Sequence, residues 1–479
     1  MKIQEKLKGL KNFSAPGPDG LLSNVLKELS YELSFPLSIL FNKCLSTGFV
    51  PTDWKRANVT PLFKKGSKTE ASNYRPVSLT AILCRVMESL MKDNIYGFLH
   101  YHKLIRDTQH GFSSNRSTLT NMLSFMEDMT KLMDDGLNVD VLYLDFAKAF
   151  DKVPIQRLLS KCRGLGLGGD LLNWISEWLT GRQQRVVLNG EASDWAPVTS
   201  GVPQGSVLGP LLFLIFINDI DSVVDLVSTF LYKFADDTKM GAPIRSPLDA
   251  EEFQKQIDAL CSWASKWQMV YNVSKCHIIH VGKSNPQHEY NMNGAKLEMS
   301  TEEKDVGTIV SNDLKPSKHC AQIAKKANGI LGLICRGLSY RNKKTFIRIY
   351  TVFVRSILET DSPVWSPWNK ADIALIESVQ KRALRMVSGL KSSNYEDRLK
   401  ELNMETLEIR REKKDLLQVF KVLKGFDRVD PSKWFDMFEH GSEGINTRNS
   451  MGAYNLLKPK AKLEVRRNYW SVRVVDKWN

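Results

Sequence analysis

The sequence predicts an α+β fold of short strands and amphipathic helices, and three observations lead to it. Two segments rich in β-branched and aromatic residues, 139–145 and 229–234, read as strands that lead into aspartates. A stretch with three glycines and two prolines, 200–210, lies between them, and apolar residues recur at helical spacing in much of the remaining chain. With 479 residues the chain is too long for one ordinary core, so we expect several subdomains.

The segment Phe-Ala-Asp-Asp at 234–237 is predicted to form the tip of a short β-hairpin. Two adjacent aspartates in a tight turn usually serve the turn itself, because the side chain bonds nearby backbone. A third carboxylate changes this interpretation, since the strand 139–145 also ends in an acid. Two such strands can bring Asp145, Asp236 and Asp237 together, as two divalent cations about 4 Å apart require in nucleotidyl transfer.

Composition narrows the class of protein. A formal net charge of +14 favours a polyanionic partner, although charge alone is weak support. The seven cysteines are scattered without a Cys-x-x-Cys pair, which favours a reducing compartment over a disulfide framework or structural zinc. The N-terminus lacks the apolar core of a signal peptide, and the apolar run 207–217 is too short to span a bilayer. We therefore expect an intracellular protein, nuclear or cytoplasmic, with no membrane partner.

Two further stretches have the composition of ligand-binding loops. Segments 54–66 and 73–79 are predicted to form a hairpin that carries Lys64, Lys65 and Arg75. Those cations fit either a solvated basic turn or a clamp on a triphosphate, for which arginine offers a bidentate fork. The loop 200–210, which contains Gln204 and Gly205, can approach a ligand closely through its backbone and leads into a predicted helix at 211–217.

Beyond residue 248 we expect a helix at 248–267, a turn and strand at 271–282, and one arm of a hairpin at 304–310. From Lys315 to Leu358 there are ten cations and no Asp or Glu, on a predicted amphipathic helix. They indicate either a plain solvated face or, more in keeping with ten uncompensated charges, a phosphate-backbone track. The residues 396–426 are predicted to be helical. The cations that we select as nucleic-acid ligands are Lys318, Lys325, Lys326, Arg336 and Arg341.

Taken together, these motifs and their order resemble the reverse transcriptase of non-LTR retrotransposons (LINE-type elements), closest to the CR1, L2 and jockey groups. In this resemblance Asp145 with Phe150, the loop 200–210, the segment 234–237 and Lys275 match the four successive palm motifs. Residues 304–307 resemble the primer grip, and the basic helices resemble the thumb. The resemblance implies a right-hand polymerase fold with fingers, an antiparallel palm sheet, a helical thumb and a C-terminal helical extension. It implies an N-terminal extension and fingers at 1–135, a reverse transcriptase domain at 45–311 with the palm at 136–311, a thumb at 312–395 and a C-terminal extension at 396–479.

The resemblance also implies residue roles. Asp145 and Asp236 would ligate two Mg²⁺ ions, with Mn²⁺ as a substitute, while Asp237 assists and the backbone carbonyl of Phe146 adds a ligand. Phe150 would exclude a 2′-hydroxyl, and Gln204 and Gly205 would line the nucleotide pocket. Lys275 is a candidate general acid towards pyrophosphate, or else a surface lysine at a turn.

The function implied is an RNA-directed DNA polymerase that takes an RNA template, a DNA primer and deoxynucleoside triphosphates. We expect the chain to lack the endonuclease domain that family members commonly carry, and a fragment of a decayed genomic copy is one interpretation of it. A catalytically silent nucleic-acid-binding remnant is the alternative, and RNA synthesis on an RNA template is disfavoured by Phe150. The sequence predicts no particular oligomeric state.

Overall fold

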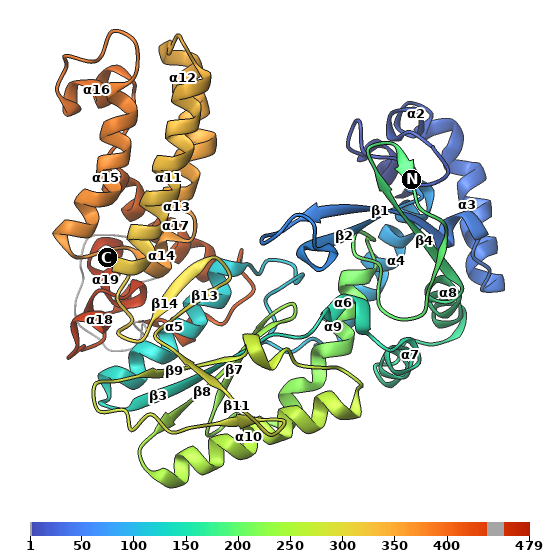
Figure 1. The fold of residues 1–479 in the computed structure, drawn as a ribbon, viewed down its shortest axis with the longest axis horizontal. Coiled ribbons are helices and arrows are strands. Elements are labelled where there is room, and N and C mark those ends of the chain that lie inside the picture. Colours follow the sequence, from blue (N-terminus) through green and yellow to red (C-terminus); the bar gives the residue numbers. More distant parts are fainter. Residues whose placement is uncertain (1, 438–454) are drawn as a thin grey trace, which may run out of the picture. The chain divides into compact units, whose positions relative to one another are not determined.

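The computed structural model describes residues 2–437 and 455–479, and the chain divides into two compact units. Unit 1 comprises Met1–Phe112, Asp145–Val224 and Gln256–Asn272. Unit 2 comprises Ser113–Leu144, Asp225–Lys255 and Val273–Asn479. Each unit thus joins segments that lie far apart in the sequence, and each contains its own five-stranded sheet (Figure 1).

The sheet of unit 1 has the strand order β2-β1-β4-β5, with β6 paired to β4. β1 and β2 form the antiparallel hairpin expected from the sequence, and β4 joins β1 in parallel. Buried and half-exposed residues alternate along the first half of β1, so only one face of this sheet is buried there. The elements of unit 1 are α1 (Lys2–Lys8), α2 (Ser23–Glu28), α3 (Ser30–Thr47), β1 (Arg56–Phe63), β2 (Tyr74–Thr80), α4 (Ile82–Tyr101), α6 (Ala149–Lys152), α7 (Ile155–Gly164), α8 (Gly169–Leu179), β4 (Arg182–Leu188), β5 (Glu191–Ala192), β6 (Ala196–Val198) and α9 (Gly209–Ile217). α10 (Pro247–Lys266) contributes residues to both units.

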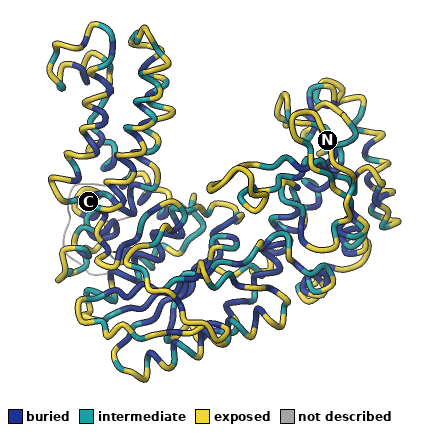
Figure 2. The backbone as a smooth tube through the Cα atoms, viewed as in Figure 1, coloured by how far each residue is buried: buried dark blue, intermediate teal, exposed yellow. Residues whose placement is uncertain are grey.

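The sheet of unit 2 has the strand order β12-β9-β3-β8-β7. Strands β9, β3, β8 and β7 run antiparallel to their neighbours, and β12 joins β9 in parallel. The strands are β3 (Asn138–Leu144), β7 (Phe230–Phe234), β8 (Asp237–Ile244), β9 (His277–Val281) and β12 (Glu298–Ser300). β3 and β8 are buried along most of their length, which the dark strands of Figure 2 make visible. The central strands therefore have no solvated face.

The helix α5 (Thr118–Asp134) packs against β3 and β7, and its side chains start the main core of unit 2. Its N-terminus carries a capping box, in which Ser117 accepts from the Thr120 amide and Thr120 accepts from the Ser117 amide. Phe125 of α5, fully buried, lies against the rings of Tyr143, Phe230 and Tyr232 from the sheet. This packing fixes the helix across one face of the sheet.

The remainder of unit 2 is mostly helical. The long helices α11 (Ser317–Gly337) and α15 (Lys370–Arg385) pack on each other through buried stripes that include Ile323, Ala327, Ile376 and Val379. The remaining elements are β10 (Asn291–Met292), β11 (Ala295–Lys296), β13 (Glu302–Asp305), β14 (Thr308–Ser311), α11 (Ser317–Gly337), α12 (Lys343–Tyr350), α13 (Ser356–Glu359), α14 (Ser362–Trp365), α15 (Lys370–Arg385), α16 (Tyr395–Glu401), α17 (Leu407–Leu423), β15 (Asp436–Met437), β16 (Leu456–Leu457), α18 (Glu464–Arg467), α19 (Trp470–Arg473) and α20 (Val475–Trp478).

Most of the secondary structure expected from the sequence is confirmed, including the strand before Asp145 and the hairpin at 234–237. One expectation is wrong. The segment 304–310 is not one arm of a hairpin but crosses its turn, because Val306 and Gly307 both adopt positive φ between β13 and β14. The segment 396–426 is mostly helical, as expected, and forms two helices, α16 and α17, with Asn403 in the left-handed conformation between them.

Candidate active site

The turn between β7 and β8 presents two of the predicted carboxylates. Phe234 pairs with Asp237 across the hairpin, which leaves Ala235 and Asp236 as the two turn residues. Ala235 has a φ of 59°, as the first central residue of a type II′ turn requires. An alanine in the left-handed region costs about 1–2 kcal/mol, so the hairpin holds a strained residue directly before Asp236. Asp236 is half-buried and Asp237 is exposed.

The third predicted carboxylate follows the central strand of the same sheet. β3 ends at Leu144, whose cross-strand partner is Thr238 in β8, and Asp145 is the next residue of the chain. The backbone after β3 is held within unit 1: the Asn272 amide donates to the Asp145 carbonyl at 2.8 Å, and the Ala147 amide donates to the Val270 carbonyl at 2.8 Å. Between these bonds the ring of Phe146 stacks on Tyr271 at 4.5 Å. The pairing of this segment with residues 270–272 uses the carbonyl of Asp145 and not that of Phe146, the carbonyl predicted as a metal ligand.

In the part of the chain that the structure describes, no group of three or more His, Cys, Asp or Glu side chains is arranged to hold a metal ion. The three-carboxylate metal site at positions 145, 236 and 237 therefore stays a prediction. The chemistry of the donors fits such a site, because carboxylate oxygens are the ligands that hard divalent cations prefer.

Lys275 lies at the same end of the sheet of unit 2. It closes a short 3-10 turn, Val273–Lys275, directly before β9, and its side chain is exposed. β9 runs antiparallel to β3, with Tyr143 opposite His277, so the start of β9 is beside the end of β3. The order of residues in the sequence could not by itself show that Lys275 lies beside the end of β3.

The glycine-rich loop is tied to two neighbouring backbones of unit 1. The Val202 amide donates to the Phe150 carbonyl and the Gly201 amide to the Val153 carbonyl, both at 2.8 Å, while the Gln204 carbonyl accepts from the Ser78 amide at 2.7 Å. A Cβ at Gly201 would meet the Asp151 carbonyl oxygen at 2.6 Å, and one at Gly205 would meet the Ser78 carbonyl oxygen at 2.5 Å. The glycines thus permit close approach to the chain's own backbone, which is how the loop is placed between β2 and Phe150.

The three cations of the β1–β2 hairpin are exposed. Arg75 pairs with Leu62 near the end of the hairpin, and the Lys64 amide donates to the Asn73 carbonyl at 2.9 Å. Burial raises the pKa of the Asp151 carboxyl, while the charges of Lys148 and Lys64 act against that rise. Lys64 therefore lies near enough to the segment after Phe150 to act on its charge.

The basic segment expected to track phosphates is confirmed as helical, but its charges are not all uncompensated. Lys318 forms an ion pair with Glu302 at 2.9 Å, and Lys343 and Arg355 pair with Glu401 and Glu359. Acidic residues outside the segment supply these partners, which its local composition could not reveal. The predicted nucleic-acid ligands Lys325, Lys326 and Arg336 are exposed on α11. Arg341 is half-buried and donates to the Cys335 carbonyl at 2.8 Å, near the end of that helix.

Sequence reasoning missed a buried ion pair beneath the β13–β14 hairpin. Lys239 of β8 pairs with Asp305, and both side chains are buried. The Lys239 ammonium also donates to the Asn121 amide oxygen at 2.8 Å and lies 4.4 Å from the centre of the Phe125 ring. Burial lowers the pKa of Lys239, although Asp305 opposes this shift. The only sequence signal was a lysine at a position where the strand pattern demands a buried residue.

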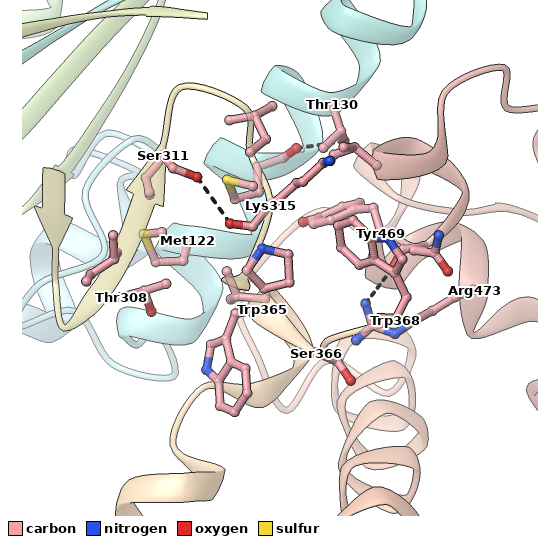
Figure 3. A pocket seen from close by; sticks show the side chains of 18 residues that line it. Met122, Thr130, Thr308, Ser311, Lys315, Trp365, Ser366, Trp368, Tyr469 and Arg473 are labelled. Carbon is pink, nitrogen blue, oxygen red and sulfur yellow. Dashed lines mark hydrogen bonds between the residues drawn. The ribbon is translucent and has the colours of Figure 1, made fainter. Parts of the chain in front are cut away.

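A pocket lies between α5, β14 and the segments around α14 and α19 of unit 2 (Figure 3). Trp365, Trp368, Tyr469 and Arg473 contribute to its lining, and Arg473 donates to the Asn468 carbonyl at 2.8 Å. Its cavity volume of about 30 Å³ suffices for a water molecule but not for a nucleotide. It is therefore no candidate for the nucleotide site.

Comparison with known proteins defines the class to which these features belong. Residues 63–317, more than half of the chain, match the family described as reverse transcriptase (RNA-dependent DNA polymerase). The chain belongs to this family, and the α+β, right-hand polymerase fold expected from the sequence is confirmed. Reverse transcriptases use divalent metal ions for nucleotidyl transfer.

Individual relatives narrow the class to non-LTR retrotransposons. The chain is 27% identical over 386 residues to the RNA-directed DNA polymerase from mobile element jockey of Drosophila melanogaster, covering 78% of the chain and 42% of the relative. It is 24% identical over 402 residues to the probable RNA-directed DNA polymerase from transposon BS, and 25% identical over 398 residues to that from transposon X-element, both of Drosophila melanogaster. Each of these two alignments covers 81% of the chain and 44% of the relative. The predicted resemblance to jockey-like elements is confirmed, and the chain spans less than half the length of these curated relatives.

Among the helices of residues 2–437 and 455–479, none combines the length and the apolar character needed to cross a membrane.

Proposed function

We propose that this chain is an RNA-directed DNA polymerase that extends a DNA primer on an RNA template by two-metal nucleotidyl transfer. The observation that carries the proposal is the strand register of the sheet in unit 2. Leu144, the last residue of β3, is paired with Thr238, so β3 ends at the end of the sheet where the β7–β8 turn presents Asp236 and Asp237, and Asp145 is the next residue of the chain. Carboxylates that follow or connect neighbouring strands at one end of a sheet are the kind of residues that can share divalent cations in nucleotidyl transfer.

In this proposal Asp145 and Asp236 hold two Mg²⁺ ions, for which Mn²⁺ can substitute, with Asp237 beside them and the Phe146 carbonyl as a further ligand. When bound, the ions lower the pKa of the primer 3′-hydroxyl and neutralise the charge of the leaving pyrophosphate. Lys275 donates a proton to the pyrophosphate from its place at the start of β9. The strained Ala235 supports the assignment, because such strain gathers at functional sites.

The remaining roles concern the substrates. Lys64, Lys65 and Arg75 bind the triphosphate, Gln204 and Gly205 line the nucleotide pocket, and Phe150 excludes the 2′-hydroxyl of a ribonucleotide. The exposed cations of α11 (Lys318, Lys325, Lys326 and Arg336), together with Arg341 just after that helix, contact the phosphates of the template and primer. The palm then corresponds to residues 136–311 and the thumb to 312–395. The scattered spacing of the seven cysteines, without a Cys-x-x-Cys pair, favours a reducing compartment, so we assign the chain to the nucleus or the cytoplasm.

The test is primer extension by the purified chain on poly(rA)/oligo(dT) with dTTP and Mg²⁺. We expect Asp236→Ala to lower incorporation by at least about 100-fold, since it removes charge stabilisation at the transferring phosphoryl group. Binding of the template–primer should change by less than about twofold, because phosphate contacts supply that affinity. The matched control is Asp194→Ala, which removes an exposed carboxylate from the β5–β6 connection and should leave incorporation unchanged. Equal incorporation by Asp236→Ala and the parent chain would refute the proposal, and a parent that binds template without extending primer would identify a silent remnant.

A further inference from the structure

Three phenylalanines of unit 1, Phe112, Phe150 and Phe213, lie in contact. Phe150 is the residue to which we assign exclusion of the 2′-hydroxyl. The half-buried ring of Phe150 stacks on Phe213, with centroids 4.3 Å apart and planes inclined by 17°. Phe213 belongs to α9 and is fully buried. One face of the Phe150 ring is therefore covered by a side chain that cannot itself move into solvent.

Phe112 closes a second side of the same ring. It meets Phe150 edge-to-face, with centroids 6.1 Å apart and planes inclined by 82°. Unlike Phe213, Phe112 is 52% exposed, and its φ of 53° places it in the left-handed region that aromatic residues rarely adopt. The preceding backbone is fixed by a bond from the Gly111 amide to the side-chain oxygen of Gln109 at 2.8 Å, and Gln109 is buried. The loop thus presents an aromatic side chain to Phe150 at the cost of an unfavourable backbone conformation.

The backbone of Phe150 is held as firmly as its ring. Its carbonyl accepts from the Val202 amide at 2.8 Å, and the Ser200 hydroxyl donates to the neighbouring Asp151 carbonyl at 2.9 Å. With the backbone fixed, the direction of the Phe150 side chain depends on rotation about its own bonds. Phe213 limits that rotation from behind and Phe112 limits it from the side.

We propose that Phe112 and Phe213 are positioning residues that set the sugar selectivity of the polymerase by holding the ring of Phe150 in its excluding orientation. This inference rests on the proposed function, in which Phe150 contacts the sugar. If the Phe150 ring can rotate away, the site accommodates a 2′-hydroxyl. Replacing either Phe112 or Phe213 should therefore raise the incorporation of ribonucleotides. Aromatic contacts of this kind typically correspond to about a 2- to 12-fold change in an equilibrium.

The experiment compares kcat/KM for dTTP and UTP on poly(rA)/oligo(dT), using the full chain. We expect Phe112→Leu and Phe213→Leu each to lower the dTTP-to-UTP ratio by about 2- to 12-fold, mainly by raising kcat/KM for UTP. Leucine keeps an apolar side chain at both positions, and Phe112 is exposed enough for its replacement to be tolerated. Phe112→Tyr keeps the ring and should retain the parental ratio. Phe35→Leu, at an exposed phenylalanine of α3, is the control for general loss of an aromatic surface.

A double-mutant comparison separates positioning from a merely structural role. In a Phe150→Ala background, which should itself lower the ratio strongly, Phe112→Leu and Phe213→Leu should have no further effect on it. A parental ratio in both single variants, or an equal fall with and without Phe150, would overturn the inference while the polymerase assignment stands. Extension by the parent with a ratio unaffected by Phe150→Ala would instead contradict the role given to Phe150 in the proposed function, and the inference with it.

Discussion

The two five-stranded sheets of this protein differ in the burial of the charged side chains on their strands. In unit 2 the central strands β3 and β8 are buried almost throughout. In unit 1 buried and half-exposed residues alternate along the first half of β1, and half-exposed and exposed residues alternate along β4 after its first residue. The unit 2 sheet nevertheless contains Asp140 and Lys239 in its interior. The unit 1 sheet keeps Arg56 and Arg185 on its half-exposed face, although Arg182, the first residue of β4, is buried.

The partners of these charges explain the difference. Asp140 accepts from the Tyr290 hydroxyl at 2.6 Å and from the Asn285 amide at 2.7 Å, and it lies 2.7 Å from the Nδ1 atom of His280. On the unit 1 sheet, the guanidinium of Arg185 lies 4.6 Å from the centre of the Trp195 ring and remains in reach of water. A charge without solvent needs several specific partners, while a solvated charge needs none. Replacing a buried charge of the unit 2 sheet should therefore cost much more stability than replacing a half-exposed charge of the unit 1 sheet.

The largest effect is expected at the buried ion pair of unit 2. Lys239→Met leaves Asp305 buried without its cation and should lower the free energy of unfolding by about 3–5 kcal/mol. Thermal and chemical denaturation of the full chain would measure it. Lys296→Met, which removes the cation of an exposed pair with Glu289, should change stability by less than about 1 kcal/mol. Similar losses in both variants would show that burial does not distinguish the two pairs.

An intermediate effect should follow from pH at His319, which is buried at the start of α11 and accepts from the Ile309 amide at 3.2 Å. Burial, and secondarily the charge of Lys304, lowers the pKa of His319 from 6.5 to about 4. The unfolded chain therefore binds more protons between these values. This contribution to stability is complete above about pH 6.5 and is lost as the pH falls towards 4. It amounts to roughly 3 kcal/mol.

The measurement is the free energy of unfolding between pH 4 and 7 in the parent and in His319→Gln. The variant should lose part of the pH dependence, whatever its stability at pH 7. An unchanged slope in the variant would assign the pH dependence to other groups.

The smallest effect is expected on the half-exposed face of the unit 1 sheet. Arg185→Ala removes a cation–π contact with Trp195 and a hydrogen bond to the Asn58 side-chain oxygen at 2.9 Å. Because water can replace both, stability should fall by no more than about 1 kcal/mol. Denaturation of Arg185→Ala beside Arg185→Lys would measure it, and a loss as large as that of Lys239→Met would contradict the comparison.

The same comparison explains what could be predicted from the sequence. The strand before Asp145 and the hairpin around Asp236 depend on local composition, so the sequence suffices to identify them. The Lys239–Asp305 pair joins residues 66 positions apart, and a lysine in a strand normally indicates a solvated face. The ion pair of Lys318 with Glu302 could not be predicted either, because Glu302 precedes the basic segment 315–358 and does not contribute to its local composition. Local patterns thus suffice to predict strands, turns and the residues to which we assign the chemistry, but they do not predict which distant residues pair with a given charge.

The side chain of Ala235 limits the backbone conformations that are open to the β7–β8 turn. A glycine at position 235 would relieve the left-handed backbone of Ala235, yet it would also allow that backbone many more directions. The acid that follows would then sample orientations in which its oxygens point away from any shared ion. The unfavourable backbone conformation of Ala235 therefore restricts the orientation of the Asp236 side chain before a substrate binds.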